Sequence, residues 1–328
     1  MTRTPIKDGV VSSPYPPIEL PQNESFYQLV TRRFLQHADQ PALVRSGERL
    51  TFPAVLSLME RYANGFQRHG VSCGSRVCVN VSNSAESLVA AYSLCCLGAA
   101  VVLMKPTLPE REVLHHVEDS HPDYILTEKQ NSEMILNIHK KYKFKEKKVA
   151  NSKNHGFEDT TNHVLLYVYT SGTTGLPKAV EVSVFAFNTS VELCRAGEFY
   201  NEDDVVLGWN PVTHTSGFLL SMAAFICGAM VVPSQWRLSP KDFVEIVNEH
   251  KVTSMCAFPT AIRQLVFQLN EGLVPSLKRI MMCGTSSTED LYQRILQVFQ
   301  LESLRNGYGM SEAFRVSYRH TGEHHWIS

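Results

Sequence analysis

The sequence lacks the cysteine spacing of a disulfide framework or a zinc site. It has eight cysteines, but no two of them form a Cys-x-x-Cys pair. Most of them lie in apolar runs, at Cys95, Cys96, Cys194, Cys227, Cys256 and Cys283. This placement is typical of buried free thiols in a reducing compartment. We therefore expect neither disulfide bonds nor a cysteine-bound metal.

The sequence also lacks an excess of charge of one sign. Its 31 lysines and arginines nearly balance its 32 aspartates and glutamates, for a net charge of −1. No global field therefore points to nucleic acid or to an acidic membrane. The basic run 139–148 admits two interpretations, a nucleic-acid or import patch and a solvated surface. We favour the solvated surface, since nothing else in the chain indicates nucleic-acid binding.

Targeting and membrane-spanning segments are absent from the pattern as well. Residues 1–21 are polar and proline-rich without an apolar core, and the final Trp-Ile-Ser is not a peroxisomal Ser-Lys-Leu signal. The longest apolar stretch, 88–104, is interrupted by Gly98 and is interpreted as helix, turn and strand. We expect an intracellular protein, cytoplasmic or peroxisomal, with no membrane span. Its oligomeric state stays open.

What the sequence contains is an alternation of strand-like and helix-like segments. With 328 residues, 44% of them hydrophobic, the chain is long enough for a large core in two lobes. The expected strands are 42–45, 49–52, 77–81, 100–103, 124–127, 164–169, 178–183, 205–209, 229–232, 254–258 and 279–283. The expected helices are 26–37, 53–69, 85–97, 109–119, 217–227, 240–250, 260–270 and 289–300. The alternation predicts an α/β fold with two stacked, doubly wound sheets.

Some helix starts and one connection can also be predicted. Ser25 and Thr288 are expected to cap the helices that follow them, and Thr107 with Glu110 has the spacing of a capping box. Residues 128–162 are interpreted as a polar connection.

A loop of small hydroxyl residues and glycines lies between two strand-like runs, 164–169 and 178–183. Its bare backbone N–H groups, its hydroxyls and one lysine are the groups needed to hold a polyphosphate. The residues are Thr170, Ser171, Gly172, Thr173, Thr174, Gly175 and Lys178. The spacing fits neither a Walker loop nor a Rossmann turn. The alternative is a flexible surface hairpin.

The string Tyr-Thr-Ser-Gly-Thr-Thr-Gly-Leu-Pro-Lys at 169–178 resembles the phosphate loop of the adenylate-forming superfamily. That superfamily includes acyl-CoA synthetases, firefly-luciferase-like enzymes and peptide-synthetase adenylation domains. The proline-rich start of the chain and the string Tyr-Gly-Met-Ser-Glu at 308–312 are most similar to the 4-coumarate–CoA ligase and fatty acyl-CoA synthetase branch. The resemblance covers about residues 26–314.

Three further segments resemble the superfamily in its order. The segment 210–217 carries His214, which by resemblance lines and gates the carboxylate pocket. Because His214 is expected near a helix start, a cation is disfavoured there and the neutral donor form is favoured. The segment 281–286 carries Gly284 and Thr285, and it faces the adenine and the acyl group in the family. The segment 306–312 resembles Gly-Tyr-Gly-x-Thr-Glu, with Ser311 in place of the usual threonine.

The resemblance assigns roles to these residues. Residues 170–178 would hold the β and γ phosphates of ATP, Glu312 would hold Mg²⁺, and Tyr308 with Gly284 would hold the adenine. The rest of the nucleotide segment is Asn306, Gly307, Gly309 and Ser311. His214 and Glu312 are the candidate catalytic residues. The implied reaction joins a fatty or aryl carboxylic acid to AMP, after which coenzyme A displaces the AMP.

The chain departs from the family pattern at its C-terminal end. Family members continue with a β-rich subdomain and a C-terminal lid domain that carries a catalytic lysine, whereas this sequence ends at residue 328. We therefore expect a C-terminally truncated chain with impaired turnover. The alternative is a non-catalytic nucleotide-binding fragment or pseudoenzyme isoform. The expected organisation is a tail (1–24), a first α/β subdomain with the polar connection (25–162), the phosphate loop with a second α/β subdomain (163–314) and a divergent tail (315–328).

Two rival motifs occur near the C-terminal end. Gly309-Met-Ser311-Glu-Ala313 is similar to the nucleophile elbow of serine hydrolases, but only 17 residues follow Ser311 and none of them is an aspartate. The pattern His320-Thr-Gly-Glu-His324 is similar to a zinc motif, but Gly322 disfavours the helix that such a motif needs. We favour neither.

Overall fold

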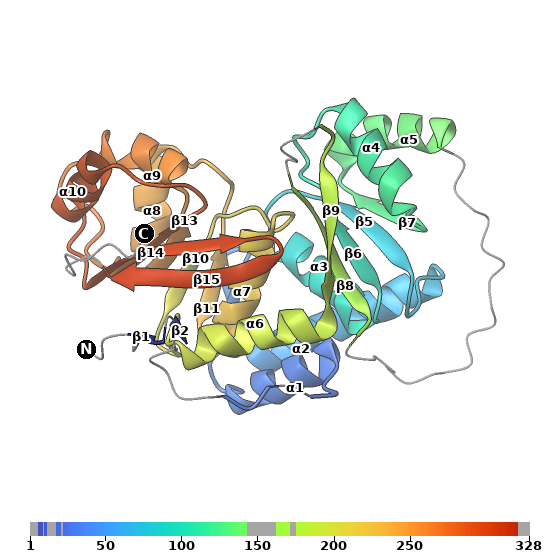
Figure 1. Ribbon diagram of the computed structural model, residues 1–328, viewed down its shortest axis with the longest axis horizontal. Helices are drawn as coiled ribbons and strands as arrows, with labels where there is room; N and C mark the ends of the chain where they lie inside the picture. Colours follow the sequence, from blue (N-terminus) through green and yellow to red (C-terminus); the bar gives the residue numbers. More distant parts are fainter. Residues whose placement is uncertain are drawn as a thin grey trace.

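The structure is a computed structural model that describes residues 6–8, 10–11, 18–20, 22–142, 162–170 and 175–320 (Figure 1). Several sequence predictions fall outside these residues. Ser171, Gly172, Thr173 and Thr174 of the phosphate loop are among them, as is the zinc pattern after His320.

Two sheets form the framework of the molecule, which confirms the α/β prediction. The larger sheet has the strand order β15-β14-β13-β12-β10-β11-β3-β4, and the smaller has the order β7-β5-β6-β8-β9. Strands within each sheet run parallel, while β4, β15 and β9 are antiparallel edge strands. The larger sheet contains β3 (Pro41–Arg45), β4 (Glu48–Thr51), β10 (Val205–Gly208), β11 (Met230–Pro233), β12 (Ser254–Ala257), β13 (Arg279–Cys283), β14 (Ser303–Met310) and β15 (Ala313–His320). The smaller sheet contains β5 (Arg76–Asn80), β6 (Ala100–Leu103), β7 (Tyr124–Thr127), β8 (Val164–Thr170) and β9 (Lys178–Ser183).

Helices connect these strands and cover the sheets, as parallel strands require. They are α1 (Phe26–Gln36), α2 (Phe52–Arg68), α3 (Ala85–Cys96), α4 (Glu110–Ser120), η1 (Lys129–Asn131), α5 (Ser132–Lys141), α6 (Val184–Ala196), α7 (Thr215–Ile226), α8 (Pro240–His250), α9 (Pro259–Val266) and α10 (Glu289–Val298). A short antiparallel pair, β1 (Ile6–Lys7) and β2 (Val10–Val11), lies before them. None of the helices in the described ranges could span a membrane, because each is too short or too polar.

Each sheet takes strands from both sides of the boundary expected near residue 163. The early β3–β4 hairpin joins the larger sheet, because Leu43 pairs with Val231 of β11. The later β8–β9 hairpin joins the smaller sheet, because Leu166 pairs with Val101 of β6. The hairpin that carries the phosphate loop therefore lies at one edge of the smaller sheet.

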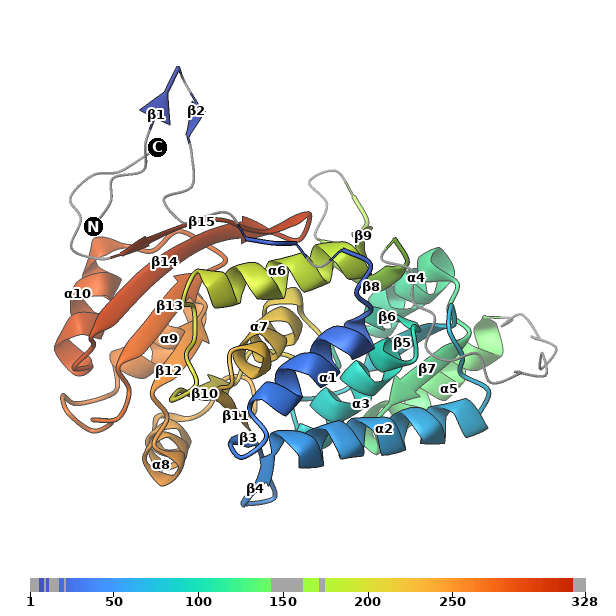
Figure 2. The ribbon, with the colours of Figure 1, turned by 90° about the horizontal axis from the view of Figure 1, so that it is seen from below.

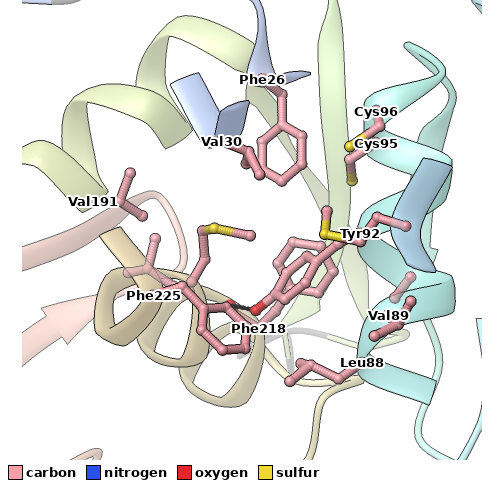
Figure 3. Packing of buried hydrophobic residues seen from close by; sticks show 14 of the residues in the cluster. Phe26, Val30, Leu88, Val89, Tyr92, Cys95, Cys96, Val191, Phe218 and Phe225 are labelled. Carbon is pink, nitrogen blue, oxygen red and sulfur yellow. Dashed lines mark hydrogen bonds between the residues drawn. The ribbon is translucent and has the colours of Figure 1, made fainter. Parts of the chain in front are cut away.

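One hydrophobic cluster contains buried residues of both sheets, among them Val101 of β6 and Val231 of β11. Figures 1 and 2 show the helices that lie between the sheets. Helices α3 and α7 are apolar on nearly all sides, which is typical of helices with no solvent face. Figure 3 shows Tyr92 of α3 against Phe218 of α7, with ring centroids 4.8 Å apart. The Tyr92 hydroxyl donates to the Phe218 carbonyl at 2.7 Å, so the one polar atom of this buried ring is satisfied. Packing of these helices joins the two sheets.

The helix starts confirm two of the three predicted caps. The Ser25 hydroxyl accepts from the Gln28 N–H, and Thr288 accepts from the Leu291 N–H. The capping box expected at Thr107 is wrong. Helix α4 begins at Glu110 after Pro109 and has no side-chain cap.

The structure also adds elements that the sequence analysis did not predict. Helices η1 and α5 lie within the expected polar connection, and α6 follows β9 directly. Residues 303–320 form the β14–β15 hairpin, so part of the expected divergent tail is an edge strand. The hairpin carries the segment 306–312 as strand and turn.

Candidate active site

The phosphate hairpin is closed at its base by the pair Thr170 and Lys178. The Thr170 hydroxyl donates to the Lys178 carbonyl at 3.5 Å, and the Lys178 side chain is exposed. Because side chains alternate along a strand, Thr170 and Lys178 belong to the same face as Val168 and Val180. That face packs on the core shared with α3, α6 and α7. Lys178 and the nearby Gly175 are both exposed.

The opposite face of this hairpin packs against α4. His116 stacks on Tyr169 with ring centroids 3.7 Å apart, and the His115 Nε2 donates to the Pro177 carbonyl at 2.8 Å. A cavity of about 610 Å³ opens on this face and reaches Lys178. Neither His214 nor Glu312 lines it. These α4 contacts support the hairpin from behind, and the sequence analysis did not find them.

His214 is the N-cap residue of α7, which confirms its expected place at a helix start. Its Nδ1 accepts from the Ser216 N–H at 3.2 Å and lies 2.9 Å from the Ser216 hydroxyl. An accepting Nδ1 places the proton on Nε2. Burial and, to a lesser extent, the charge of Lys105 lower the pKa of His214 to about 4. The imidazole is neutral at pH 7, chiefly because it is desolvated, so Nε2 is an N–H donor.

Lys105 follows the carboxyl end of β6 and belongs to the other sheet. Its positive charge lowers the pKa of His214. A cation from the smaller sheet therefore acts on a histidine from the larger sheet. Desolvation lowers the pKa of Lys105 itself, and Glu112 acts in the opposite direction. The sequence analysis missed Lys105. The available signal was its position directly after a parallel strand, where α/β sheets bind ligands.

Gly284 lies against the ring of Phe258 immediately after β13. Its backbone has φ +95°, and a Cβ built on it would lie 2.4 Å from the Phe258 ring. Only glycine fits such an approach without a shift of the ring. The His214 ring meets the same phenylalanine edge to face, with centroids 5.7 Å apart. Phe258, which the sequence analysis did not single out, therefore joins two of the predicted site residues.

Neighbouring residues of the nucleotide segment lie beside Gly284. The strand pairing places Asn306 opposite Met282 and Gly307 opposite Cys283, one residue before Gly284. Thr285 follows and is exposed. Four of the predicted residues are thus brought together beside the carboxyl end of β13: Gly284, Thr285, Asn306 and Gly307.

Tyr308, Gly309, Ser311 and Glu312 occupy the turn end of the β14–β15 hairpin. Tyr308 is 59% exposed, and Glu312 is exposed in the turn. Phe314, just beyond the turn, contacts Phe187 of α6, the helix that begins where β9 ends. In both views the turn end of this hairpin points toward the β8–β9 hairpin (Figures 1 and 2).

The antiparallel turn also bears on the rival motifs. A nucleophile elbow needs a strand followed by a helix, whereas Gly309 to Ala313 connects two antiparallel strands. The described residues hold no group of three or more His, Cys, Asp or Glu side chains able to bind a metal. Glu312 is a single exposed carboxylate, which fits Mg²⁺, since Mg²⁺ usually takes one or two carboxylates plus phosphate oxygens and water.

A sequence model of the family described as AMP-binding enzyme matches residues 30–326. The chain belongs to this family. The chain is 27% identical over 279 residues to the 2-succinylbenzoate–CoA ligase of Bacillus subtilis (strain 168), covering 83% of the chain and 56% of that protein. It is 23% identical over 295 residues to the luciferin 4-monooxygenase of Photinus pyralis, covering 80% of the chain and 54% of that protein. The chain thus spans about half the length of these AMP-binding relatives.

Solved structures support the same fold. The long-chain-fatty-acid–CoA ligase of Archaeoglobus fulgidus superposes with a TM-score of 0.82 at 19% identity, over 94% of the chain and 68% of that protein. ATP-bound MatB of Rhodopseudomonas palustris superposes with a TM-score of 0.76 at 17% identity, over 90% of the chain and 62% of that protein. The two sheets described above are those of the N-terminal domain of adenylate-forming ligases.

Proposed function

We propose that the protein binds ATP and a carboxylic acid and joins them into an acyl adenylate, with release of pyrophosphate. The observation that carries this proposal is the edge-to-face contact of the His214 ring with Phe258, whose ring also packs against Gly284. This contact brings the Nε2 donor of His214 beside the predicted adenine segment, and the effect of Lys105 on the pKa of His214 indicates a cation in the same region. A carboxylate needs both, because its charge is costly to bury without a partner.

The nucleotide would lie across the segments that the two hairpins present. Gly284 and Tyr308 would flank the adenine, since a glycine admits a flat ring and an exposed aromatic stacks on one. Lys178, with the hydroxyl and glycine residues 170–174, would hold the β and γ phosphates. Glu312 and the phosphates would hold Mg²⁺, whose chemistry is to neutralise the charge that develops on the phosphates. Attack of the carboxylate oxygen on the α-phosphorus then forms one bond as the bond to pyrophosphate breaks.

A second step to an acyl-CoA thioester is part of the proposal. Relatives named 2-succinylbenzoate–CoA ligase and 4-coumarate–CoA ligase match more than four-fifths of the chain. They support coenzyme A as the thiol and an aryl or fatty acid as the substrate. In this step the thiol sulfur attacks the acyl carbon, and AMP leaves.

The test is carboxylic-acid-dependent exchange of labelled pyrophosphate into ATP, measured with the purified chain over a panel of fatty and aryl acids. We expect one class of acid to stimulate exchange. We expect His214→Ala to lower it roughly 100-fold, because a positioned donor is removed. His69→Ala, a change at an exposed histidine, serves as the control.

Each alternative outcome has its own meaning. ATP binding with no exchange for any acid would favour a nucleotide-binding protein without catalysis. Exchange that His214→Ala leaves unchanged would contradict the role given to this residue.

A further inference from the structure

Two cysteines meet beneath the Phe258–Gly284 contact. The Cys256 and Cys283 sulfurs lie 3.3 Å apart on the neighbouring parallel strands β12 and β13. Cys256 is buried and Cys283 is partly exposed, while all eight cysteines of the chain are free thiols.

The environment makes the two thiols chemically different. The hydrogen bond to Cys283 and then burial raise the pKa of the Cys256 thiol, so Cys256 keeps its proton and donates to the Cys283 sulfur. This hydrogen bond lowers the pKa of the Cys283 thiol. The more accessible sulfur is therefore the better nucleophile, and a second thiol lies in contact with it. An attacking thiolate beside a resolving thiol is the arrangement that reversible oxidation needs.

We propose that Cys256 and Cys283 form a reversible intrachain disulfide when the protein meets a peroxide. The Cys283 thiolate attacks one peroxide oxygen, which breaks the O–O bond and gives a sulfenic acid and hydroxide. The Cys256 thiol then displaces the sulfenic oxygen as water and forms the S–S bond. Two thiols lose two electrons and two protons, and hydrogen peroxide becomes two molecules of water. The proposal goes beyond the activity proposed above and does not depend on it.

Closing the bond requires a diagonal approach across the strand pair, because Cys256 lies opposite Met281, two residues before Cys283. A disulfide has its sulfurs about 2.05 Å apart, so the two must approach by about 1.2 Å. Cys283 is the last residue of β13, and Cys256 precedes the last residue of β12. The backbone leaves the sheet just beyond them, where fewer ladder hydrogen bonds resist a shift.

The same movement acts on aromatic neighbours. Phe258 lies two residues after Cys256 and Gly284 one after Cys283. The Trp209 Nε1 donates to the Cys256 carbonyl at 2.7 Å. The ring centroids of Trp236 and Phe258 lie 5.6 Å apart. Tryptophan fluorescence therefore reports on the bond without any nucleotide.

The test uses the full chain carrying Cys73→Ser, which removes the one exposed cysteine. After limited hydrogen peroxide, remaining thiols are alkylated in denaturant and the protein is digested without reductant. We expect a peptide pair linked through Cys256 and Cys283 that dithiothreitol separates, with Cys95 and Cys96 recovered as alkylated thiols. Tryptophan emission should change with the same time course and recover with dithiothreitol. Cys283→Ser should abolish both signals.

Contrary outcomes are equally defined. Recovery of both cysteines as free thiols, at peroxide levels that oxidise Cys73 in the unsubstituted chain, would overturn the proposal. So would a Cys283 sulfinic acid beside an unmodified Cys256. A linked pair with unchanged emission would overturn the movement of the Phe258 contact. Because no readout involves ATP, failure here is separate from failure of the proposed activity.

Discussion

Two histidines on opposite sides of the phosphate hairpin region are kept neutral by burial. Desolvation lowers the pKa of both His214 and His116 to about 4. In His214 the neutral ring presents a donor at the lobe junction. In His116 the neutral ring stacks on Tyr169 behind the phosphate hairpin, and its Nδ1 has no hydrogen-bond partner among the residues that the structure describes. One histidine therefore serves recognition, and the other serves packing.

The packing histidine should make the fold sensitive to acid. Unfolded His116 takes up its proton below its ordinary pKa of 6.5, whereas the folded protein takes it up only near 4. The unfolded state thus binds more protons between these values, so stability is full above pH 6.5 and falls toward pH 4, by up to about 3 kcal/mol. His116→Phe keeps the ring stack and should reduce the loss between pH 7 and 5. Urea unfolding at the two pH values measures it.

The matched control for this change is His69→Phe, at an exposed position. It should leave the acid sensitivity as it is. An equal pH slope in His116→Phe and the unsubstituted protein would contradict the assignment to His116.

Gly284 should be intolerant of any side chain. Gly284→Ala places a Cβ against the Phe258 ring and also strains a backbone at φ +95°. Gly272 has φ +73° with nothing within 4 Å of a built Cβ, so Gly272→Ala isolates the backbone cost. We expect a loss of about 1 kcal/mol for Gly272→Ala and of about 2–4 kcal/mol for Gly284→Ala. Denaturant unfolding of both variants gives the difference. Equal losses would show that Phe258 does not restrict the site.

At the scale of elements, the β5–α3 loop, which carries Asn83, binds the β10–α7 loop, which carries His214. The Asn83 side-chain amide donates to the carbonyls of Trp209 and Asn210 at 3.0 and 2.8 Å, and its Oδ1 accepts from the Val212 N–H at 2.7 Å. It also donates to the Ser234 carbonyl at 3.0 Å. One buried amide therefore fixes the β10–α7 loop to the smaller sheet.

Asn83→Asp should disrupt this junction more than its small change suggests. The carboxylate still accepts from Val212 but faces several carbonyls with no proton to donate. We expect a loss of about 3 kcal/mol in unfolding free energy, since a buried charge is left unpaired. Asn248→Asp, at an exposed amide that donates to the Leu273 carbonyl, is the matched control and should cost under about 1 kcal/mol. A similar small loss in both variants would contradict the role of Asn83.

Helices and strands whose apolar residues recur at a regular spacing could be predicted from the sequence. Elements that continue directly from a strand, or that contain poor strand formers, could not. The strands and helices of the two alternating units followed from runs such as 100–103 and 254–258. Helix α6 was missed although Val184, Phe187 and Val191 have helical spacing, because its N-cap residue, Ser183, is also the last residue of a strand. Strand β14 was missed because its glycines and Asn306 are poor strand formers. It is held by pairing with β13 and β15, which no local pattern shows.

At the scale of the molecule, residues from both sheets contribute to the candidate site. The segments around His214, Gly284 and Tyr308 could be found from sequence, because they carry motifs at or near strand ends. Phe258 could not, because its place depends on packing between elements far apart in the chain, and the one sequence signal for Lys105 was its position after a parallel strand. The sequence therefore identified the residues that belong to motifs. It did not identify the neighbours that pack against these residues or change their pKa values.

The central claim is that two hairpins, one from each sheet, hold one nucleotide. Titration of the purified chain with MgATP and with AMP tests it most directly, using Lys178→Ala, Tyr308→Ala and, as control, Lys241→Ala at an exposed lysine of α8. Lys178 contacts only the outer phosphates in this account, and Tyr308 contacts the base. We therefore predict that Lys178→Ala weakens ATP binding about tenfold and leaves AMP binding unchanged, while Tyr308→Ala weakens both about tenfold. Equal effects of Lys178→Ala on ATP and AMP, or no effect of either variant, would contradict the claim.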